Sequence, residues 1–197
     1  MHGFFAADRA GVAVLLIRES VVARPAAERR SVIRRKMPTK DPQRLFDDVL
    51  ARAIPEVRAA GIDVFTFAFY HDHESAAVSI CVDTEPSSVR LVRSQNAFSI
   101  RHFADAVSRG DLWKAALFKA NVGRSLSLGD FEMVNVARTD IGGVPIDDTF
   151  YLQMIRTMRA REQEIVTLTS NVERLLFCSS SAEWEVGYTW TAAPAAV

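Results

Sequence analysis

The sequence predicts an α+β domain in which helices cover a mainly antiparallel sheet of about five strands. Segments of helical period and of period two follow one another as helix, two strands, two helices, strand, helix and two strands. This order lacks the strict strand–helix alternation that is typical of parallel α/β folds. In addition, 197 residues with 49% hydrophobic and 24% charged side chains are enough for one sizeable core.

The first predicted helix begins after Asp41, which can cap it. Pro42 suits its first turn, and Gly61 can provide the left-handed residue at its end. Pro55 is expected to kink the helix or to end its regular part, because proline removes a backbone donor. Apolar residues at helical spacing predict one buried stripe: Leu45, Phe46, Val49, Leu50, Ala53, Ile54 and Val57.

A β-hairpin is predicted after Gly61. Residues 62–70 alternate with period two, and residues 76–83 form the expected returning strand. Apolar residues on both faces of 62–70 predict an inner strand. Between the strands, residues 71–75 are expected to form a five-residue polar loop. One face of the first strand is expected to present Phe65, Phe67 and Phe69.

The middle of the chain is predicted to be helical. Residues 86–96 can form a helical turn, and Ser99 can cap a further segment that ends at Gly110. Asp111 is then expected to cap another segment that ends before Gly123.

A third strand is predicted over 131–138, followed by a long helix that opens at Asp147 or Asp148. Residues 173–178 and 183–190 are expected to form a closing pair of strands around a serine turn. The buried stripe of the long helix is expected to comprise Tyr151, Met154, Ile155, Met158, Ile165 and Leu168.

Aromatic residues recur at every second or fourth position of the last predicted strand, as Trp184, Tyr188 and Trp190. Such a row can be sheet core, or it can be a surface on which a small molecule stacks. Both interpretations remain open at the level of the sequence.

Charge is divided unevenly along the chain. Residues 1–40 contain nine Lys+Arg and three Asp+Glu, a balance of +6, whereas residues 41–197 contain 15 and 21, a balance of −6. We therefore expect a basic arm over 1–40, a single domain over 41–190 and a loose tail over 191–197. Met37 is an alternative start, in which case 1–36 are not part of the native protein. The basic arm is also the one segment expected to suit nucleic acid.

A cytoplasmic location is expected. The longest apolar run, 10–17, is far shorter than the ~20 residues of a membrane span, so no membrane association is predicted. Cys81 and Cys178 lie far apart within apolar runs, which favours buried free thiols in a reducing compartment.

A metal site could use His71 and His73, which can point to one side of an extended segment. The nearest later acids, Asp83 and Glu85, lie at the other end of the predicted hairpin, ~23 Å away at ~3.3 Å a residue. They cannot share a metal ion with the two histidines. A metal-assisted hydrolase built on the His71/His73 loop is therefore an alternative that lacks its further ligands, beside the simpler interpretation of a solvated loop.

The turn at 83–86 places two carboxylates close together, for acid–base chemistry or simply for capping the next helix. No nucleophile elbow and no phosphate-binding glycine loop occurs in the sequence, and it contains four histidines. We predict no cofactor and no catalytic set. The sequence is thus more typical of a binding protein than of an enzyme.

Several short motifs resemble an uncharacterised bacterial domain family of about this length, some of whose members resemble immunity proteins of polymorphic toxin systems. The motifs are the strand 67–72, the Asp83-Thr84-Glu85 turn, the helical segment around Trp113 and Leu128-Gly-Asp-Phe131. The family usually has Asn where Asp83 stands, and its C-terminal part differs from 184–190.

This resemblance implies binding to a protein, such as a basic toxin domain whose cleft the chain would occlude, rather than catalysis. An acidic body suits that role, because complementary charge speeds and selects the encounter. A further alternative is that the chain is a domain that binds a small molecule. The residues expected to contact the partner are Asp72, Glu74, Asp83, Glu85 and Trp113.

Overall fold

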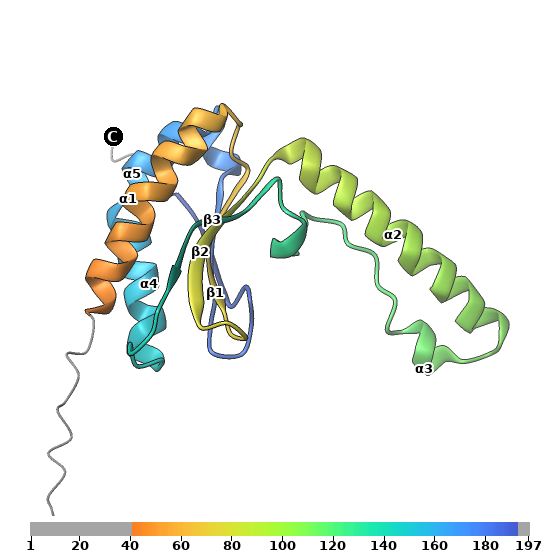
Figure 1. Ribbon diagram of the computed structural model, residues 1–197. Helices are drawn as coiled ribbons and strands as arrows, with labels where there is room; N and C mark the ends of the chain where they lie inside the picture. Colours follow the sequence, from red (N-terminus) through yellow and green to blue (C-terminus); the bar gives the residue numbers. More distant parts are fainter. Residues whose placement is uncertain (1–40, 193–197) are drawn as a thin grey trace, which may run out of the picture. The chain divides into compact units, whose positions relative to one another are not determined.

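The computed structural model describes residues 41–192, so the predictions for residues 1–40 and for 193–197 of the predicted tail lie outside the described residues. Thr191, predicted to begin the loose tail, is instead a strand residue. Its sheet has the strand order β3-β2-β1-β4-β5 (Figure 1). β1 is parallel to β4, and the pairs β1–β2, β2–β3 and β4–β5 are antiparallel. The α+β prediction is therefore confirmed, with a mixed and mainly antiparallel sheet. The strands are β1 (Thr66–Asp72), β2 (Ala77–Asp83), β3 (Met133–Asp140), β4 (Leu176–Ser179) and β5 (Tyr188–Thr191).

Helices α1 and α4 lie together on one side of the sheet, as Figure 1 shows. The α-helices are α1 (Pro42–Ala60), α2 (Glu85–Ser108), α3 (Leu112–Ala115), α4 (Asp148–Ala160) and α5 (Glu162–Ile165). Short 3-10 turns are η1 (Leu128–Asp130), η2 (Val166–Leu168) and η3 (Val172–Arg174). No helix within residues 41–192 is both long enough and apolar enough to cross a membrane.

Helix α1 forms as its sequence predicts. The Asp41 side chain accepts a hydrogen bond from the Gln43 amide, and Gly61 ends the helix at φ 65°. All seven residues of the predicted stripe are buried. The helix nevertheless continues through Pro55 to Ala60, so Pro55 does not end it. Pro55 lies on the exposed side, where water can satisfy the carbonyl group that it leaves without a donor.

The main core lies between α1, α4 and one face of the sheet. Phe46 of α1 makes edge contacts with Phe69 of β1 at 5.3 Å and with Phe150 of α4 at 5.0 Å between ring centroids. On the other face, Ala68, Cys81 and Cys178 form a smaller buried cluster with Leu128 and Phe131. Both cysteines are buried and free, as predicted.

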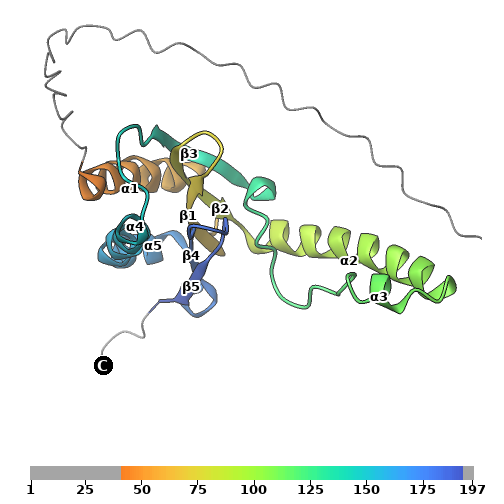
Figure 2. The same cartoon turned by 90° about the horizontal axis from the view of Figure 1, so that it is seen from below.

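Helix α2 is one continuous helix, which corrects the prediction of two segments divided at Ser99. Thr84 is its cap and accepts from the Ser87 amide at 3.3 Å. Residues 87–108 contain neither glycine nor proline, so no residue in this stretch interrupts the helix. Asp111 caps α3 as expected, but α3 is a single turn rather than a segment reaching Gly123. Figure 2 shows α3 beside the C-terminal half of α2.

The remaining elements are shorter or shifted relative to their predictions. β3 begins at Met133, because Phe131 packs into the second-face cluster instead of the strand. Irregular pairing with β2 accompanies left-handed φ values of 57° at Asn135 and 52° at Ala137. Asp147 caps α4, whose regular part ends at Ala160, so the predicted long helix is divided into α4, α5 and η2.

The last strand also differs from its prediction. β5 begins at Tyr188, and Trp184 lies in the connection that precedes it. Trp190 stacks on Phe177 with 5.5 Å between ring centroids, whereas Trp184 and Tyr188 are exposed. The aromatic row is thus divided between core and surface.

Candidate interaction surface

His71 is a buried strand residue, not a residue of a solvated loop as expected. β1 continues to Asp72, so the connection to β2 is shorter than predicted. The Nδ1 atom of His71 lies 3.0 Å from the Tyr151 hydroxyl of α4. Burial, with a contribution from His73, lowers the pKa of His71 to about 4.

The two histidines do lie on one side, as predicted, with 4.4 Å between ring centroids. The Nε2 atom of His73 lies 3.0 Å from the Ser181 carbonyl oxygen, and Nε2 of His71 is buried without a hydrogen-bond partner. Within residues 41–192, no group of three or more His, Cys, Asp or Glu side chains could hold a metal ion. A metal ion at this place would therefore have the two imidazoles as ligands, and no third ligand among these residues.

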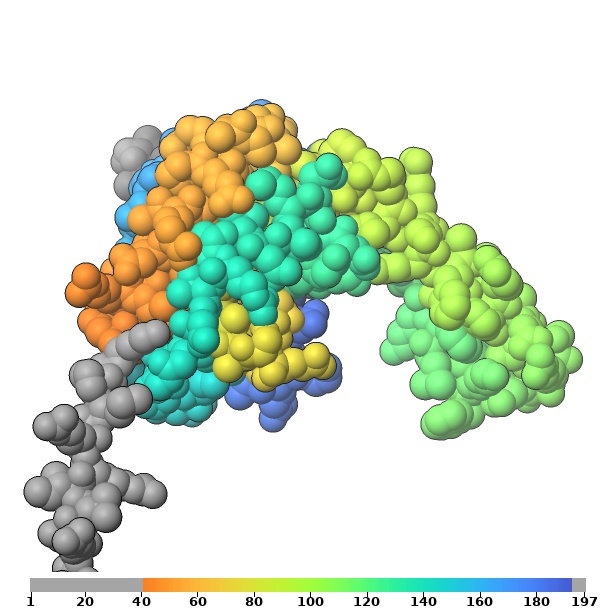
Figure 3. All heavy atoms as spheres, in the orientation of Figure 1, coloured from red at the N-terminus to blue at the C-terminus, as the bar shows by residue number. Residues whose placement is uncertain are grey.

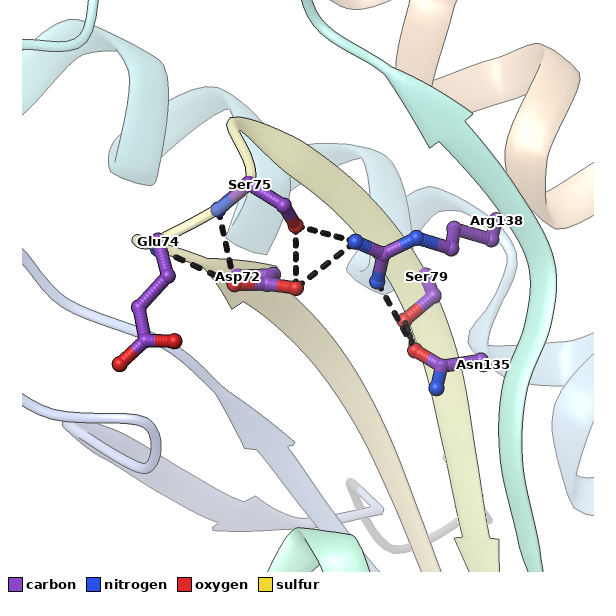
Figure 4. A network of polar contacts seen from close by, with 6 residues as sticks. All are labelled: Asp72, Glu74, Ser75, Ser79, Asn135 and Arg138. Atoms are coloured by element: carbon purple, nitrogen blue, oxygen red, sulfur yellow. Dashed lines mark hydrogen bonds and ion pairs between the residues drawn. The ribbon is translucent and has the colours of Figure 1, made fainter.

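Asp72 is the centre of a polar network at this end of the hairpin (Figure 4). One carboxylate oxygen accepts from the amides of Glu74 and Ser75, both at 3.1 Å. The other accepts from the Ser75 hydroxyl and from the Arg138 guanidinium, the latter at 2.7 Å. Arg138 also donates to the Asn135 side chain at 3.1 Å. The network ties the hairpin turn to the irregular part of β3.

Hydrogen bonds from Ser75 and Arg138 lower the pKa of Asp72, so its carboxylate stays ionised. Both carboxylate oxygens of Asp72 already accept hydrogen bonds within the protein, so its role is structural. Glu74 is exposed and points away from the network in Figure 4, so it remains available to a partner. Nearby, a cavity of about 210 Å³ is lined by Tyr70, Asp72, Cys81, Leu128, Gly129, Val134, Asn135 and Glu185.

The carboxylate turn lies at the opposite end of the same hairpin, as predicted. Asp83 pairs with Thr66 and Asp72 with Ala77, so the two ends are the first and the last of seven residue pairs. Asp83 is fully buried: one oxygen accepts weakly from the Glu132 amide at 3.4 Å, and the other has no hydrogen-bond partner. Burial raises the pKa of this carboxyl group. Asp83 therefore cannot reach a partner protein in this structure, contrary to its place in the predicted set.

Glu85 is accessible but is paired with Arg174 of η3 at 2.6 Å. Arg90 of α2 and Glu132 form a second pair at 3.3 Å beside the same cleft, whose volume is about 590 Å³. Four of the charged side chains in this cleft are thus paired within the protein, and its further carboxylate, Asp63, accepts hydrogen bonds from Ser170. Its lining includes Ile62, Asp63, Val64, Phe65, Thr84, Pro86, Thr169, Ser170 and Asn171.

Arg124 fastens the segment after α3 to the sheet. Its guanidinium donates to the Phe65 carbonyl at 2.6 Å and to the Arg174 carbonyl at 2.8 Å, and it lies 3.7 Å above the Phe65 ring. Phe65 lies just before β1, which begins at Thr66. Its ring packs under Arg124, so it does not share a face with Phe67 and Phe69 as predicted.

A different surface, on α2 and α3, is apolar and exposed. We define the α2–α3 surface as Phe98, Ile100, Phe103, Val107, Leu112, Trp113 and Leu117, all of which are exposed. Trp113 is 78% exposed and Leu112 73%, values that are high for side chains of this size. Figure 3 shows the atoms of this segment in green.

The sequence of α2 explains why this surface is unusual. Ile100, Phe103 and Val107 recur at helical spacing and predict a buried stripe, but they are exposed. The buried residues of this 24-residue helix are Ser87, Ser88 and Ala106. An apolar stripe of this kind normally faces a core, so its exposure in a single chain points to a docking surface.

A groove of about 340 Å³ lies within this surface. Residues of α2 form one wall and residues of the following segment form the other. Phe118 is held against α2 by ring contacts with His102 at 5.3 Å and Phe98 at 6.4 Å between centroids. The groove is mainly apolar, and its lining comprises Asn96, Ser99, Ile100, Phe103, Phe118 and Ala120.

Charge distinguishes this segment from the rest of the described chain. Residues 85–127 contain seven Lys+Arg and three Asp+Glu, a balance of +4. The flanking ranges 41–84 and 128–192 together contain eight and 18, a balance of −10. The α2–α3 surface is therefore apolar with basic neighbours, next in sequence to strongly acidic segments.

No protein-family model, no curated protein and no solved structure matches the chain. The candidate surface is therefore identified from the exposure and packing of its own residues. Among the five residues predicted to contact a partner, Trp113 lies on it, Glu74 and Glu85 are accessible elsewhere, and Asp72 and Asp83 are engaged or buried. Ile100 and Phe103 were missed, because their helical spacing is also that of a core stripe, and Phe98 lies outside that spacing.

Proposed function

We propose that the chain is a non-catalytic protein-binding domain that contacts its partner through the α2–α3 surface. The observation that supports this most directly is the exposure of Ile100 on α2 and of Leu112 and Trp113 on α3. Exposed apolar clusters of this kind mark protein interfaces, and tryptophan is the residue type most enriched among energetic hot spots.

The partner that we propose is a bacterial toxin domain, which the chain inhibits in the bacterial cytoplasm. The motif resemblance to immunity-like proteins supports this choice. The balance of −10 over residues 41–84 and 128–192 would draw a basic partner toward the chain at long range, whereas residues 85–127, at +4, would contact it through their apolar side chains and not through charge. Inhibition would follow from covering the toxin's active cleft.

Co-expression of the chain with the product of the adjacent gene tests this proposal, followed by calorimetry on the purified pair. We expect a stable complex whose association rate falls as salt rises. Trp113→Ala and Leu112→Ala should each weaken binding by about tenfold or more, the usual loss at a hot spot.

Leu152→Ala is the matched control, because Leu152 is an exposed apolar residue of α4. It should leave the affinity unchanged. If the neighbouring product neither binds nor is inhibited, or if all three variants bind alike, the proposal fails.

A further inference from the structure

We propose that the groove between α2 and Phe118 binds the Trp184 loop of a second copy of this chain. This inference deepens the proposed function, since it depends on the α2–α3 surface being a protein-binding surface and names one occupant of it. The Trp184 loop is defined as residues 181–187, between β4 and β5.

The loop presents one large apolar side chain between two acids. Trp184 is 67% exposed, and Glu183 and Glu185 on either side of it are exposed as well. None of these three side chains is buried by the rest of the described chain. A tryptophan in this setting is a typical interface anchor.

The loop also contains two hydrogen bonds between Ser181 and Trp184. The Ser181 amide donates to the Trp184 carbonyl at 2.9 Å, and the Trp184 amide donates to the Ser181 hydroxyl at 3.1 Å. Gly187 packs so closely on Ser181 that a Cβ atom there would lie 2.3 Å from the Ser181 Cβ. Ordering this loop before binding lowers the entropic cost of docking.

The groove has the complementary character. Its walls include Ile100, Phe103 and Phe118, which suit an indole ring. Two basic residues follow lining residues directly in sequence: Arg101 comes after Ile100, and Lys119 after Phe118, and both are exposed. Basic residues next in sequence to the lining of an apolar groove give this segment the charge that an acidic loop with a central tryptophan requires.

Charge favours a second copy over the chain's own basic segment as the occupant. Residues 1–40 have a balance of +6 and would be repelled by residues 85–127, at +4, whereas the Glu183–Glu185 segment is attracted. Residues 41–192 of each copy supply both this groove and this loop, so a twofold dimer would make the contact twice.

Sedimentation velocity over about 1 to 100 µM, the range for a weak-to-moderate dimer, tests this inference on the full chain. We expect a concentration-dependent dimer. Trp184→Ala and Phe103→Ala should each raise the dimer dissociation constant about tenfold or more. Leu152→Ala should leave it unchanged, and circular dichroism confirms that each variant is folded.

A charge exchange tests the pairing itself. Lys119→Glu and Glu183→Lys should each weaken the dimer, and the double variant should restore most of the loss. A chain that stays monomeric throughout the range overturns the inference, and so does a double variant no better than either single one.

The two proposals fail separately. Trp184→Ala leaves the α2–α3 surface intact and removes the second copy that competes for its groove, so this variant should bind the toxin partner at least as tightly as wild type even when it no longer dimerises. A dimer without any toxin binding contradicts the proposed function alone, and toxin binding by a strict monomer contradicts this inference alone.

Discussion

His71 and Tyr151 form a hydrogen bond inside the core, with 3.0 Å between Nδ1 and the phenolic oxygen. This bond joins strand β1 to helix α4 at the end of the hairpin. The His71 ring also contacts Phe150, with 5.3 Å between centroids. A histidine that the sequence offers as a loop ligand is thus part of the packing between sheet and helix.

Acid should destabilise the protein through His71. Because its pKa is about 4 in the folded state and 6.5 when unperturbed, the unfolded state binds the proton more tightly. The free energy of unfolding should therefore fall as pH drops from about 6.5 to 4, by at most about 3 kcal/mol. Urea denaturation at a series of pH values measures this.

In His71→Gln the fall over that pH interval should be largely lost, whereas the matched variant His102→Gln on α2 should retain it. An unchanged pH profile in His71→Gln would assign the acid sensitivity to other groups. Tyr151→Phe should cost about 1 kcal/mol at neutral pH through loss of the hydrogen bond.

Removing the charge of Asp72 should destabilise the hairpin turn. In Asp72→Asn, the amide loses the ionic hydrogen bond from Arg138 and one of its acceptor oxygens, and we expect a loss of about 1–3 kcal/mol at pH 7. The lowered pKa means that wild type has this stabilisation above about pH 4, the unfolded value, and loses it as pH falls further.

Chemical denaturation at pH 7 measures the loss in Asp72→Asn. Glu74→Gln, two residues further along the chain and exposed, is the control and should change stability by less than about 0.5 kcal/mol. Equal effects of the two substitutions would contradict the role given to the network.

Asp83 should behave in the opposite way. Its raised pKa means that the folded state disfavours the charged carboxylate, so its destabilising effect grows as pH rises above about 4. Asp83→Asn removes a buried ionisable carboxyl group, one oxygen of which has no hydrogen-bond partner among the described residues. We expect this variant to be more stable than wild type at pH 7, with the difference vanishing near pH 3.

Thermal unfolding of both proteins at the two pH values measures this difference. A destabilised Asp83→Asn at pH 7 would show that the contacts with Glu132 and Ser87 outweigh the cost of burying the charge.

Arg124 should matter more than its position in a connecting segment suggests. Arg124→Lys keeps the charge but loses the planar group that reaches two carbonyls and covers the Phe65 ring, for an expected cost of about 1–3 kcal/mol. Arg93→Lys on the exposed side of α2 is the control. Hydrogen exchange should also show faster opening of 116–127 in Arg124→Lys alone.

The sequence correctly predicted those parts of the fold that depend on interactions between neighbouring residues. Asp41, Asp111 and Asp147 cap their helices as expected, because a cap depends on one side chain and two or three neighbouring amides. The β1–β2 hairpin follows from the period-two pattern and the polar residues between its strands. The prediction that the histidine turn and the Asp83 turn lie at opposite ends of this hairpin is therefore correct.

Sequence patterns did not predict features that depend on contacts between distant segments. Trp184, Tyr188 and Trp190 share one pattern, but within residues 41–192 only Trp190 stacks on another ring, that of Phe177. Ser99 has the chemistry of a cap, but the residues around it continue the helix. Periodicity reports which residues would share a face, and it cannot report whether anything covers that face.

The sequence alone determined the α+β class, the first helix, the central hairpin and the segregation of charge, because these depend on neighbouring residues and on composition. The tertiary structure decided the rest: His71 became core, Asp83 was enclosed, and Ile100, Phe103 and Trp113 were left in solvent. The physical reason is that burial depends on which segments meet in space, and an apolar stripe has the same sequence whether a core or a partner is to cover it.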